Sequence, residues 1–141
     1  MKTLLVFSIL FLTSCAKDFY DSVENIRVSE TDAQIIASDF VEKLSKKHPP
    51  AKNRLYLSRV DKELGKEFEK ILRDKGFGVS TIRPDKDDKK TINIAYIIDQ
   101  IEPKKVFVRL AASSGYQVST LYFKDDKKTS VRRISGFTIL E

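Results

Sequence analysis

Residue types that carry most enzyme chemistry are scarce in this chain of 141 residues. It contains one cysteine and one histidine, His48. A single cysteine excludes an internal disulfide, and one cysteine with one histidine cannot supply the ligand set of a zinc site. A hydrolase needs a nucleophile, a base and an orienting group, whereas the only histidine lies beside two prolines. The sequence therefore predicts a protein without catalytic residues, metal or cofactor.

Long blocks of one charge sign are also missing. The chain carries 26 Lys and Arg against 20 Asp and Glu, a net charge of +6, but no run of five consecutive basic residues. Basic residues are mixed with acidic ones, as in Lys86–Lys90. Such a mixture is typical of a solvated surface rather than of a nucleic-acid groove. We therefore expect no direct binding to nucleic acid.

No hydrophobic run is long enough to cross a bilayer as a helix, which takes about 20 apolar residues. The main run, Leu4–Leu12, is about half that length and follows a single charge at Lys2. This order is typical of a secretory signal that is removed after export. The sequence therefore predicts that residues 1–14 are a cleaved signal peptide.

The end of this run, Leu12-Thr13-Ser14-Cys15, resembles the lipobox of bacterial lipoproteins. The resemblance implies that signal peptidase recognises Leu12, Thr13 and Ser14. It also implies cleavage before Cys15 and acylation of its sulfur and of the new amino terminus, which would fix the protein to a lipid bilayer. In diderm hosts the family rule sends lipoproteins with Asp after the cysteine to the inner membrane. Ala16 occupies that position, which indicates the outer membrane, facing the periplasm.

The rest of the chain has globular composition, with 41% hydrophobic and 33% charged residues, and its length suits a single domain. Residues 15–30 show no sustained period and are predicted to be a lipidated, flexible tether before a domain at 31–141. Four apolar side chains in the tether lie about one helical turn apart: Phe19, Tyr20, Val23 and Ile26. They either lie on the domain or form a short motif that binds a partner protein, which is the interpretation we favour.

An amphipathic helix is predicted at the start of the domain. Thr31 followed by Gln34 is a capping-box pattern. Apolar residues then repeat at the helical period: Ala33, Ile36, Ala37, Phe40, Val41 and Leu44. Pro49-Pro50 prevents continuation, and His48 before it is expected to be a surface residue at the helix end.

A short strand and a second helix are predicted next. Arg54–Val60 has the strand pattern, and Asp61 can cap a helix that Gly76 ends in the left-handed conformation. The helix carries an apolar stripe: Leu64, Phe68, Ile71 and Leu72. Phe77–Ile82 then alternates as a strand.

The remaining residues predict a β meander. Three stretches alternate between apolar and smaller or polar residues: Ile92, Ile94, Tyr96 and Ile98; Val106, Val108 and Leu110; Tyr116, Val118, Thr120 and Tyr122. A last strand region is broken at Gly136 before Phe137–Leu140. The order α-β-α-β followed by the meander predicts an α+β fold, a two-layer sandwich of two helices on a mainly antiparallel sheet. Ile82 with its neighbours and Phe137–Leu140 are equal candidates for an edge that pairs with another protein.

The chain also resembles a known family over nearly its whole length. The lipobox at Cys15, both helices and the late hairpin are similar to those of TrbH-type conjugal transfer lipoproteins and, more distantly, to DotD-like lipoproteins of type IV secretion systems. The residues that carry the resemblance are Asp39-Phe40-Val41 and Leu44, Pro49-Pro50-Ala51, Leu55-Tyr56-Leu57, Phe68–Leu72, Gly76-Phe77 and Tyr116-Gln117-Val118-Ser119.

This resemblance implies a domain like the small amino-terminal module of secretins and no active site. It implies a structural outer-membrane lipoprotein that joins other subunits of a type IV secretion or conjugation channel in a hetero-oligomeric ring. Any contact there must be non-covalent, because no second cysteine is present. The alternative is a solitary periplasmic lipoprotein that binds peptidoglycan or regulates a cell-wall enzyme, since a basic surface would meet acidic polymers.

Overall fold

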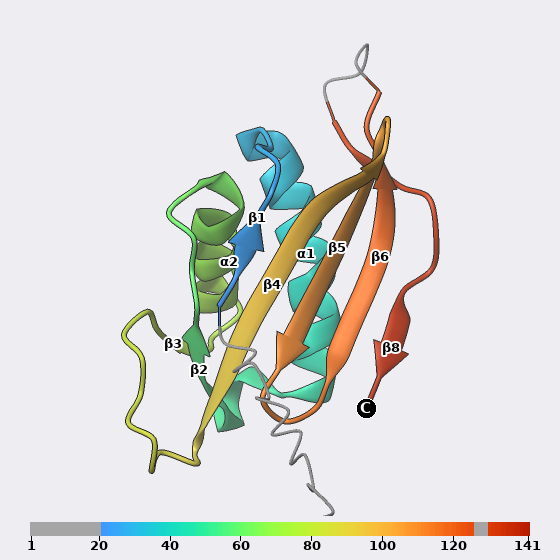
Figure 1. Ribbon diagram of the computed structural model, residues 1–141. Helices are drawn as coiled ribbons and strands as arrows, with labels where there is room; N and C mark the ends of the chain where they lie inside the picture. Colours follow the sequence, from blue (N-terminus) through green and yellow to red (C-terminus); the bar gives the residue numbers. More distant parts are fainter. Residues whose placement is uncertain (1–20, 126–129) are drawn as a thin grey trace, which may run out of the picture.

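The computed structural model describes residues 21–125 and 130–141 and shows one sheet with helices on one face (Figure 1). The helices are α1 (Glu30–Lys47) and α2 (Glu63–Asp74), with a short 3-10 turn, η1 (Pro50–Lys52), between them. The strands are β1 (Val23–Glu24), β2 (Arg54–Leu57), β3 (Gly78–Ser80), β4 (Thr91–Glu102), β5 (Lys105–Ala112), β6 (Gln117–Phe123), β7 (Arg132–Arg133) and β8 (Thr138–Leu140). The predicted α+β fold class is confirmed, and the predicted elements occur in the predicted order, with the unpredicted β1 added before α1.

The sheet has the order β3-β2-β4-β5-β6-β7, and two short strands lie off this path. β1 pairs with β4, and β8 pairs with β6. The meander β4-β5-β6 and the pairs β6-β7 and β6-β8 are antiparallel, whereas β1, β2 and β3 add parallel pairs. β2 pairs with β4 up to Ile94 and β1 pairs with it at Ile97 and Ile98, so the two short strands share one side of β4.

The core lies between the sheet and the two helices. The predicted stripe of α1 is fully buried, as are Leu64, Phe68 and Leu72 of α2. On the sheet they meet the inward residues of the predicted strands, among them the fully buried Tyr96 and Tyr122. The rings of Phe68 and Tyr96 lie 4.8 Å apart, centroid to centroid, which joins α2 to β4. Burial of each large apolar side chain contributes roughly 1.5–3 kcal/mol, so these stripes are a major source of the favourable free energy that offsets chain entropy.

The predicted helix caps were partly wrong. α1 begins after Ser29, whose hydroxyl accepts a hydrogen bond from the Asp32 backbone N–H at 3.1 Å, and Thr31 lies inside the first turn. Ser29 can take this role because Val28, directly before it, is buried and fixes where the chain enters the helix. α2 is preceded by Lys62 and has no side-chain bond from its own cap residue, so Asp61 does not cap it.

Both helix ends and one strand boundary follow from local chemistry. His48 ends α1 by donating its backbone N–H to Leu44 O at 2.8 Å, and Gly76 ends α2 with φ of +96°, as predicted. The predicted strand Phe77–Ile82 is shorter than expected, because the Ser80 hydroxyl accepts from the Ile82 N–H and donates to its carbonyl. This local turn takes Ile82 out of the sheet.

Candidate interaction surfaces

The chain joins the sheet before the predicted domain boundary at Thr31. Residues 21–30, which were predicted to belong to the tether, are described, and Val23–Glu24 forms β1. Of the four apolar residues predicted to bind a partner, Ile26 is half-buried against the core and Val23 is 40% exposed. Phe19 and Tyr20 lie outside the described residues, as do Cys15 and the lipobox. Ile26 thus fits the first interpretation, a segment that lies on its own domain.

Glu24 fixes this segment through its side chain. It is only 8% exposed, and its Oε1 accepts hydrogen bonds from the Tyr96 hydroxyl at 2.7 Å and from the Gly65 N–H at 3.1 Å. Gly65 is the third residue of α2, where a cap normally accepts a free N–H. Glu24 therefore caps α2 from outside the helix. Lys62, the residue at the cap position, makes no capping hydrogen bond with its side chain. Burial, and then the bond to Glu24, raise the pKa of Tyr96.

Only glycine fits at position 65 of this junction. A Cβ there would lie 2.2 Å from the Val60 carbonyl oxygen and 2.6 Å from the Tyr96 hydroxyl oxygen. Both distances are far below van der Waals contact, and the first involves backbone that a rotamer change does not move. Gly65 thus lets the first turn of α2 approach Tyr96 closely enough for both groups to reach the Glu24 carboxylate.

Ser22 adds a second set of bonds. Its hydroxyl donates to the Ser58 carbonyl and accepts from the Tyr96 N–H at 3.0 Å, while its own N–H donates to the Ser58 hydroxyl at 3.1 Å. The Asn25 N–H also donates to Ile98 O at 3.0 Å. This junction was not predicted from the sequence, because a strand of two residues is too short to show alternation. These hydrogen bonds therefore hold residues 21–26 against the side of β4, which is thereby covered.

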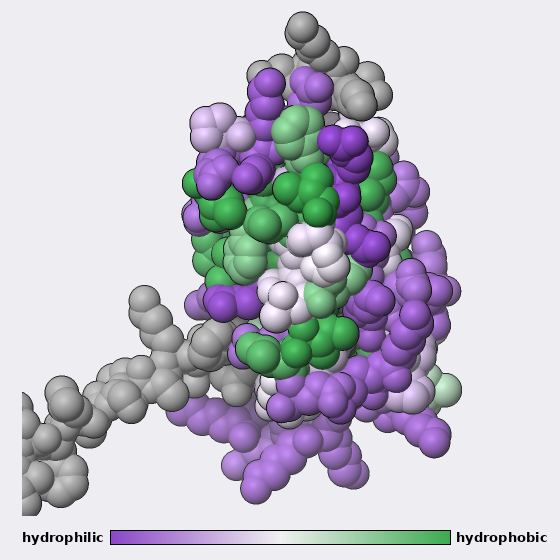
Figure 2. All heavy atoms as spheres, turned by 90° about the vertical axis from the view of Figure 1, so that its right-hand side faces the viewer, coloured by the Kyte–Doolittle hydropathy of each residue, from purple (hydrophilic) through white to green (hydrophobic). Residues whose placement is uncertain are grey.

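The other end of the chain forms a more open edge along β6. Every residue of β7 and β8 is exposed. Ile134, Ile139 and Leu140 are 42%, 44% and 58% exposed, and we refer to these three residues as the C-terminal apolar patch. The side of the molecule that carries β8 shows hydrophobic areas bordered by hydrophilic side chains (Figure 2). Beyond β8 the described residues provide no further strand, so its outer edge is unpaired within them.

Besides the pairing of β7 with β6, side-chain hydrogen bonds hold the C-terminal segment to the domain before β8. The Asp32 carboxylate, 2% exposed, accepts from the Val131 N–H at 2.8 Å. The Thr120 hydroxyl lies 3.2 and 3.1 Å from the carbonyl oxygens of Ser135 and Gly136, where the chain leaves the sheet between β7 and β8. These bonds position the segment without covering β8.

Cations border the C-terminal apolar patch. Lys43 Nζ lies 5.0 Å and the Arg133 guanidinium 4.5 Å from the centroid of the Phe137 ring, and Arg132 stacks on Phe123 at 5.3 Å. Phe137 in turn contacts Phe40 in the core edge to face, with centroids 5.5 Å apart. None of the ion pairs among the described residues includes these three cations, so positive charge gathers around Phe137 and Phe123.

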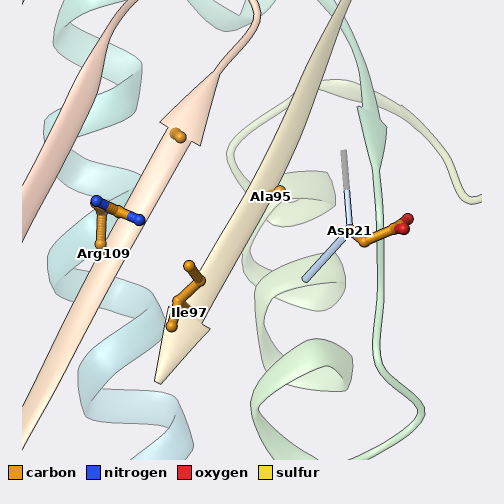
Figure 3. Close-up of a pocket in the computed structure, with 5 residues that line it drawn as sticks. Asp21, Ala95, Ile97 and Arg109 are labelled. Carbon is orange, nitrogen blue, oxygen red and sulfur yellow. The ribbon is translucent and has the colours of Figure 1, made fainter. Parts of the chain in front are cut away.

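A small hollow lies on the helix-free face of the sheet. It measures about 40 Å³ and is lined by Asp21, Ala95, Ile97, Arg109 and Ala111 (Figure 3). Small-molecule sites are usually about 300–1,000 Å³. The Asp21 side chain points away from Arg109 and accepts a hydrogen bond from Arg83 at 3.1 Å. The hollow therefore lacks the converging polar groups of a ligand site.

A larger hollow of about 550 Å³ lies beside the loop that precedes β4. Charges of both signs line it, including Arg83, Lys86, Lys89 and Asp88. The Asp88 carboxylate accepts hydrogen bonds from the Thr91 hydroxyl at 2.8 Å and from the N–H groups of Lys90 and Thr91 at 3.0 and 3.1 Å. The bond from the hydroxyl, and then those from the two N–H groups, lower the pKa of Asp88. Asp88 thus has a structural role at the start of β4.

Among the described residues, the only histidine makes structural contacts, and no cluster of side chains is suited to a metal ion. Among residues 21–125 and 130–141, no three His, Cys, Asp or Glu side chains are grouped to hold a metal ion. His48 Nε2 lies 2.9 Å from the Ser114 hydroxyl, and its ring meets Tyr116 edge to face. Burial, and then Lys47, lower the pKa of His48. His48 thus joins the end of α1 to the β5–β6 turn.

These features define a small α+β domain with an exposed apolar strand edge at β8. In the described part of the chain, no helix is both long and apolar enough to span a bilayer. The family model described as conjugal transfer protein TrbH matches residues 16–139, and the chain belongs to this family. No curated protein and no solved structure matches the chain.

Proposed function

We propose that this protein is an outer-membrane lipoprotein subunit of a conjugal transfer, type IV secretion envelope complex. Its role is structural: it contributes to assembly through protein–protein contacts and carries out no catalysis. It needs no cofactor and makes no direct contact with nucleic acid. Its other partner is the lipid bilayer, through the acylated Cys15.

The observation that carries this proposal is the TrbH family match over residues 16–139. The match begins directly after Cys15, which supports treating residues 1–14 as a signal separate from the domain. The order of the Leu4–Leu12 run and Leu12-Thr13-Ser14-Cys15 supports lipidation, and Ala16 supports the outer membrane. The exposed strand edge at β8 supports a role in contacts with other proteins.

Co-purification tests the proposal. A carboxy-terminally tagged chain is expressed in its own host together with the complete transfer system, and membranes are solubilised in mild detergent. We expect other subunits of the transfer channel to co-purify from the outer-membrane fraction. A Cys15→Ala variant serves as the control, because it should accumulate as uncleaved or unlipidated protein and lose most of these partners.

Two results would contradict the proposal. If the tagged protein were recovered alone from cells that express the whole system, it would not be a subunit of the channel. If it instead brought down only peptidoglycan or cell-wall enzymes, the alternative of a solitary periplasmic lipoprotein would be supported. Metabolic labelling with a palmitate analogue tests the anchor separately, since label should disappear in Cys15→Ala.

A further inference from the structure

The outer edge beyond β6 consists of two unlike halves. β7 contains Arg132 and Arg133, and Thr120 holds the irregular segment Ser135–Gly136 that follows it. Charged side chains and irregular backbone both discourage pairing with a further strand. β8, Thr138–Leu140, has neither a charge nor a break, and its residues are all exposed. The half of the edge that can pair with another chain is therefore β8.

We propose that β8 accepts an extended, acidic segment of another subunit as an added strand of the sheet. The identity of the partner as a subunit of the transfer complex rests on the function proposed above. Strand addition uses backbone hydrogen bonds for affinity, and side chains on alternate positions for specificity. A strand of three residues gives few such bonds. Side-chain contacts must therefore contribute to this site.

The side chains of β8 present apolar surface on both faces of the sheet. Ile139 is paired with Val118, whose side chain is fully buried, so Ile139 lies on the helix-covered face at the rim of the core. Leu140 is paired with Gln117 and so lies on the opposite face. An added strand would cover Leu140 with one set of alternate side chains and Ile139 with the other.

The charge around β8 favours an acidic partner. Lys43 and Arg133 lie on the ring of Phe137, directly before β8, and Arg132 lies on the ring of Phe123; none of the ion pairs among the described residues includes these cations. The nearby carboxylate of Glu141 is paired with Lys47 at 3.2 Å. A second copy of this chain, placed edge to edge, would bring like charges together, which is unfavourable. Asp or Glu in the added segment would instead meet these cations.

The opposite edge of the sheet lacks these properties. β3 has one apolar side chain, Val79, which is 9% exposed, and Arg54 and Arg73 border it. Ile82 beyond it is 80% exposed, but both its N–H and its carbonyl are hydrogen-bonded to the Ser80 hydroxyl. Its backbone is thus committed to a local turn. Of the two edges that the sequence left open, the structure favours β8.

Site-specific photocrosslinking in cells that express the complete transfer system tests this assignment. The photoreactive residue p-benzoylphenylalanine replaces Ile139 or Leu140 in the full chain, and Ile82 at the opposite edge serves as the exposed control. We expect a cross-link from positions 139 and 140, and none from position 82, to one channel subunit. Mass spectrometry should place it in a segment with alternating apolar residues and a net negative charge.

Two sets of variants separate the apolar and the charged contributions. Ile139→Ser with Leu140→Ser removes the apolar contact, with the photoreactive residue moved to Thr138, and Arg132→Glu with Arg133→Glu reverses the charge at the border. We expect each pair to lower the cross-link yield about tenfold. Lys66→Glu with Lys70→Glu, two exposed lysines on α2, is the matched charge reversal and should leave the yield unchanged. Circular dichroism checks that all variants are folded.

Several outcomes would overturn the inference while leaving the proposed function in place. These are normal recovery of channel subunits with no cross-link from β8, a cross-link to a second copy of this chain, or a cross-linked segment without acidic residues. An equal loss of yield in the α2 control would also overturn it, because only overall charge would then matter. Failure of the proposed function would look different, since the wild-type chain would then recover no channel subunit at all.

Discussion

The two ends of the described chain each add a short strand to the sheet, yet they are fixed very differently. β1 has two residues and β8 has three. Around β1, Ser22 and Glu24 make hydrogen bonds to α2, β4 and Ser58, and the Glu24 side chain is almost completely buried. Around β8, each residue is exposed and the nearest fixed points are Asp32 and Thr120, which hold the chain before it.

The difference shows that strand length does not decide whether an edge is closed. Two ladder residues alone would hold β1 weakly, since a backbone hydrogen bond contributes only about 1 kcal/mol net. The carboxylate of Glu24 changes this, because removing it would leave two buried donors without partners. β8 has apolar side chains but no buried polar bond of this kind, so its edge stays accessible to another chain.

The largest effect is expected from a glycine next to the amino-terminal segment, compared with a glycine in the C-terminal segment. In a lipid-free chain (residues 15–141 with Cys15→Ser), Gly65→Ala should lower the free energy of unfolding by about 3 to 4 kcal/mol, because its Cβ would overlap the Val60 carbonyl oxygen. Gly136→Ala should change it by less than about 0.5 kcal/mol, since no atom lies within 4 Å of its Cβ position. Urea unfolding monitored by circular dichroism measures both, and similar losses in the two variants would refute the contrast.

A second, smaller effect is expected from one glutamate at each end. Glu24→Ala should cost about 2 to 3 kcal/mol, because the Gly65 N–H and the Tyr96 hydroxyl lose their shared acceptor. Glu24→Gln keeps an acceptor oxygen and should cost about 1 kcal/mol. Glu141→Ala removes only an exposed ion pair with Lys47 and should cost less than about 0.5 kcal/mol.

Amide hydrogen exchange gives an independent comparison of Glu24→Ala with Glu141→Ala. The Asn25 N–H, bonded to Ile98 O, should exchange much faster in Glu24→Ala than in the wild-type chain and be unaffected in Glu141→Ala. If the Asn25 amide stayed protected without the Glu24 side chain, the backbone pairing of β1 would be sufficient by itself.

The smallest effect is a pH dependence near the C-terminal end. Burial lowers the pKa of His48 from its usual 6.5, so the unfolded chain takes up this proton at higher pH than the folded chain. The corresponding stability is fully present above about pH 6.5 and is lost as pH falls through the lower pKa of the folded state. His48→Gln should therefore show a smaller loss of unfolding free energy between about pH 7.5 and about pH 5 than the wild-type chain. An NMR titration of the ring that gave a midpoint at or above 6.5 would contradict this expectation.

The helices and the meander could be predicted from sequence because their burial is periodic. Phe40 and Leu44 repeat at the helical period, and Ile94, Tyr96 and Ile98 at the strand period, so each element carries its own signal. Gly76 was predictable for a different reason, since a left-handed residue after an apolar stripe is a local requirement of the helix end.

The junction of β1 could not be predicted in this way. Glu24 acts on Gly65 and Tyr96, which are 41 and 72 residues away in sequence, and no local pattern records such a contact. A polar stretch with scattered apolar residues predicts a linker. Only the fold shows that it lies beside α2, a helix that lacks a side-chain bond from its own cap residue. The sequence left the choice between the two sheet edges open for a similar reason, because the hydrogen bonds of Ile82 to the Ser80 hydroxyl become visible only in three dimensions.

The position of Glu24 also determines how the domain responds to mechanical load. After the exposed ion pair of Asp21 with Arg83, the first residues of the described chain that are hydrogen-bonded to the two layers are Ser22 and Glu24. Because these residues are bonded to β4 through Tyr96 and to α2 through Gly65, a load is divided between the sheet and the helix layer at this point. A pull on this end of the domain would therefore act on the sheet and on the helix layer together.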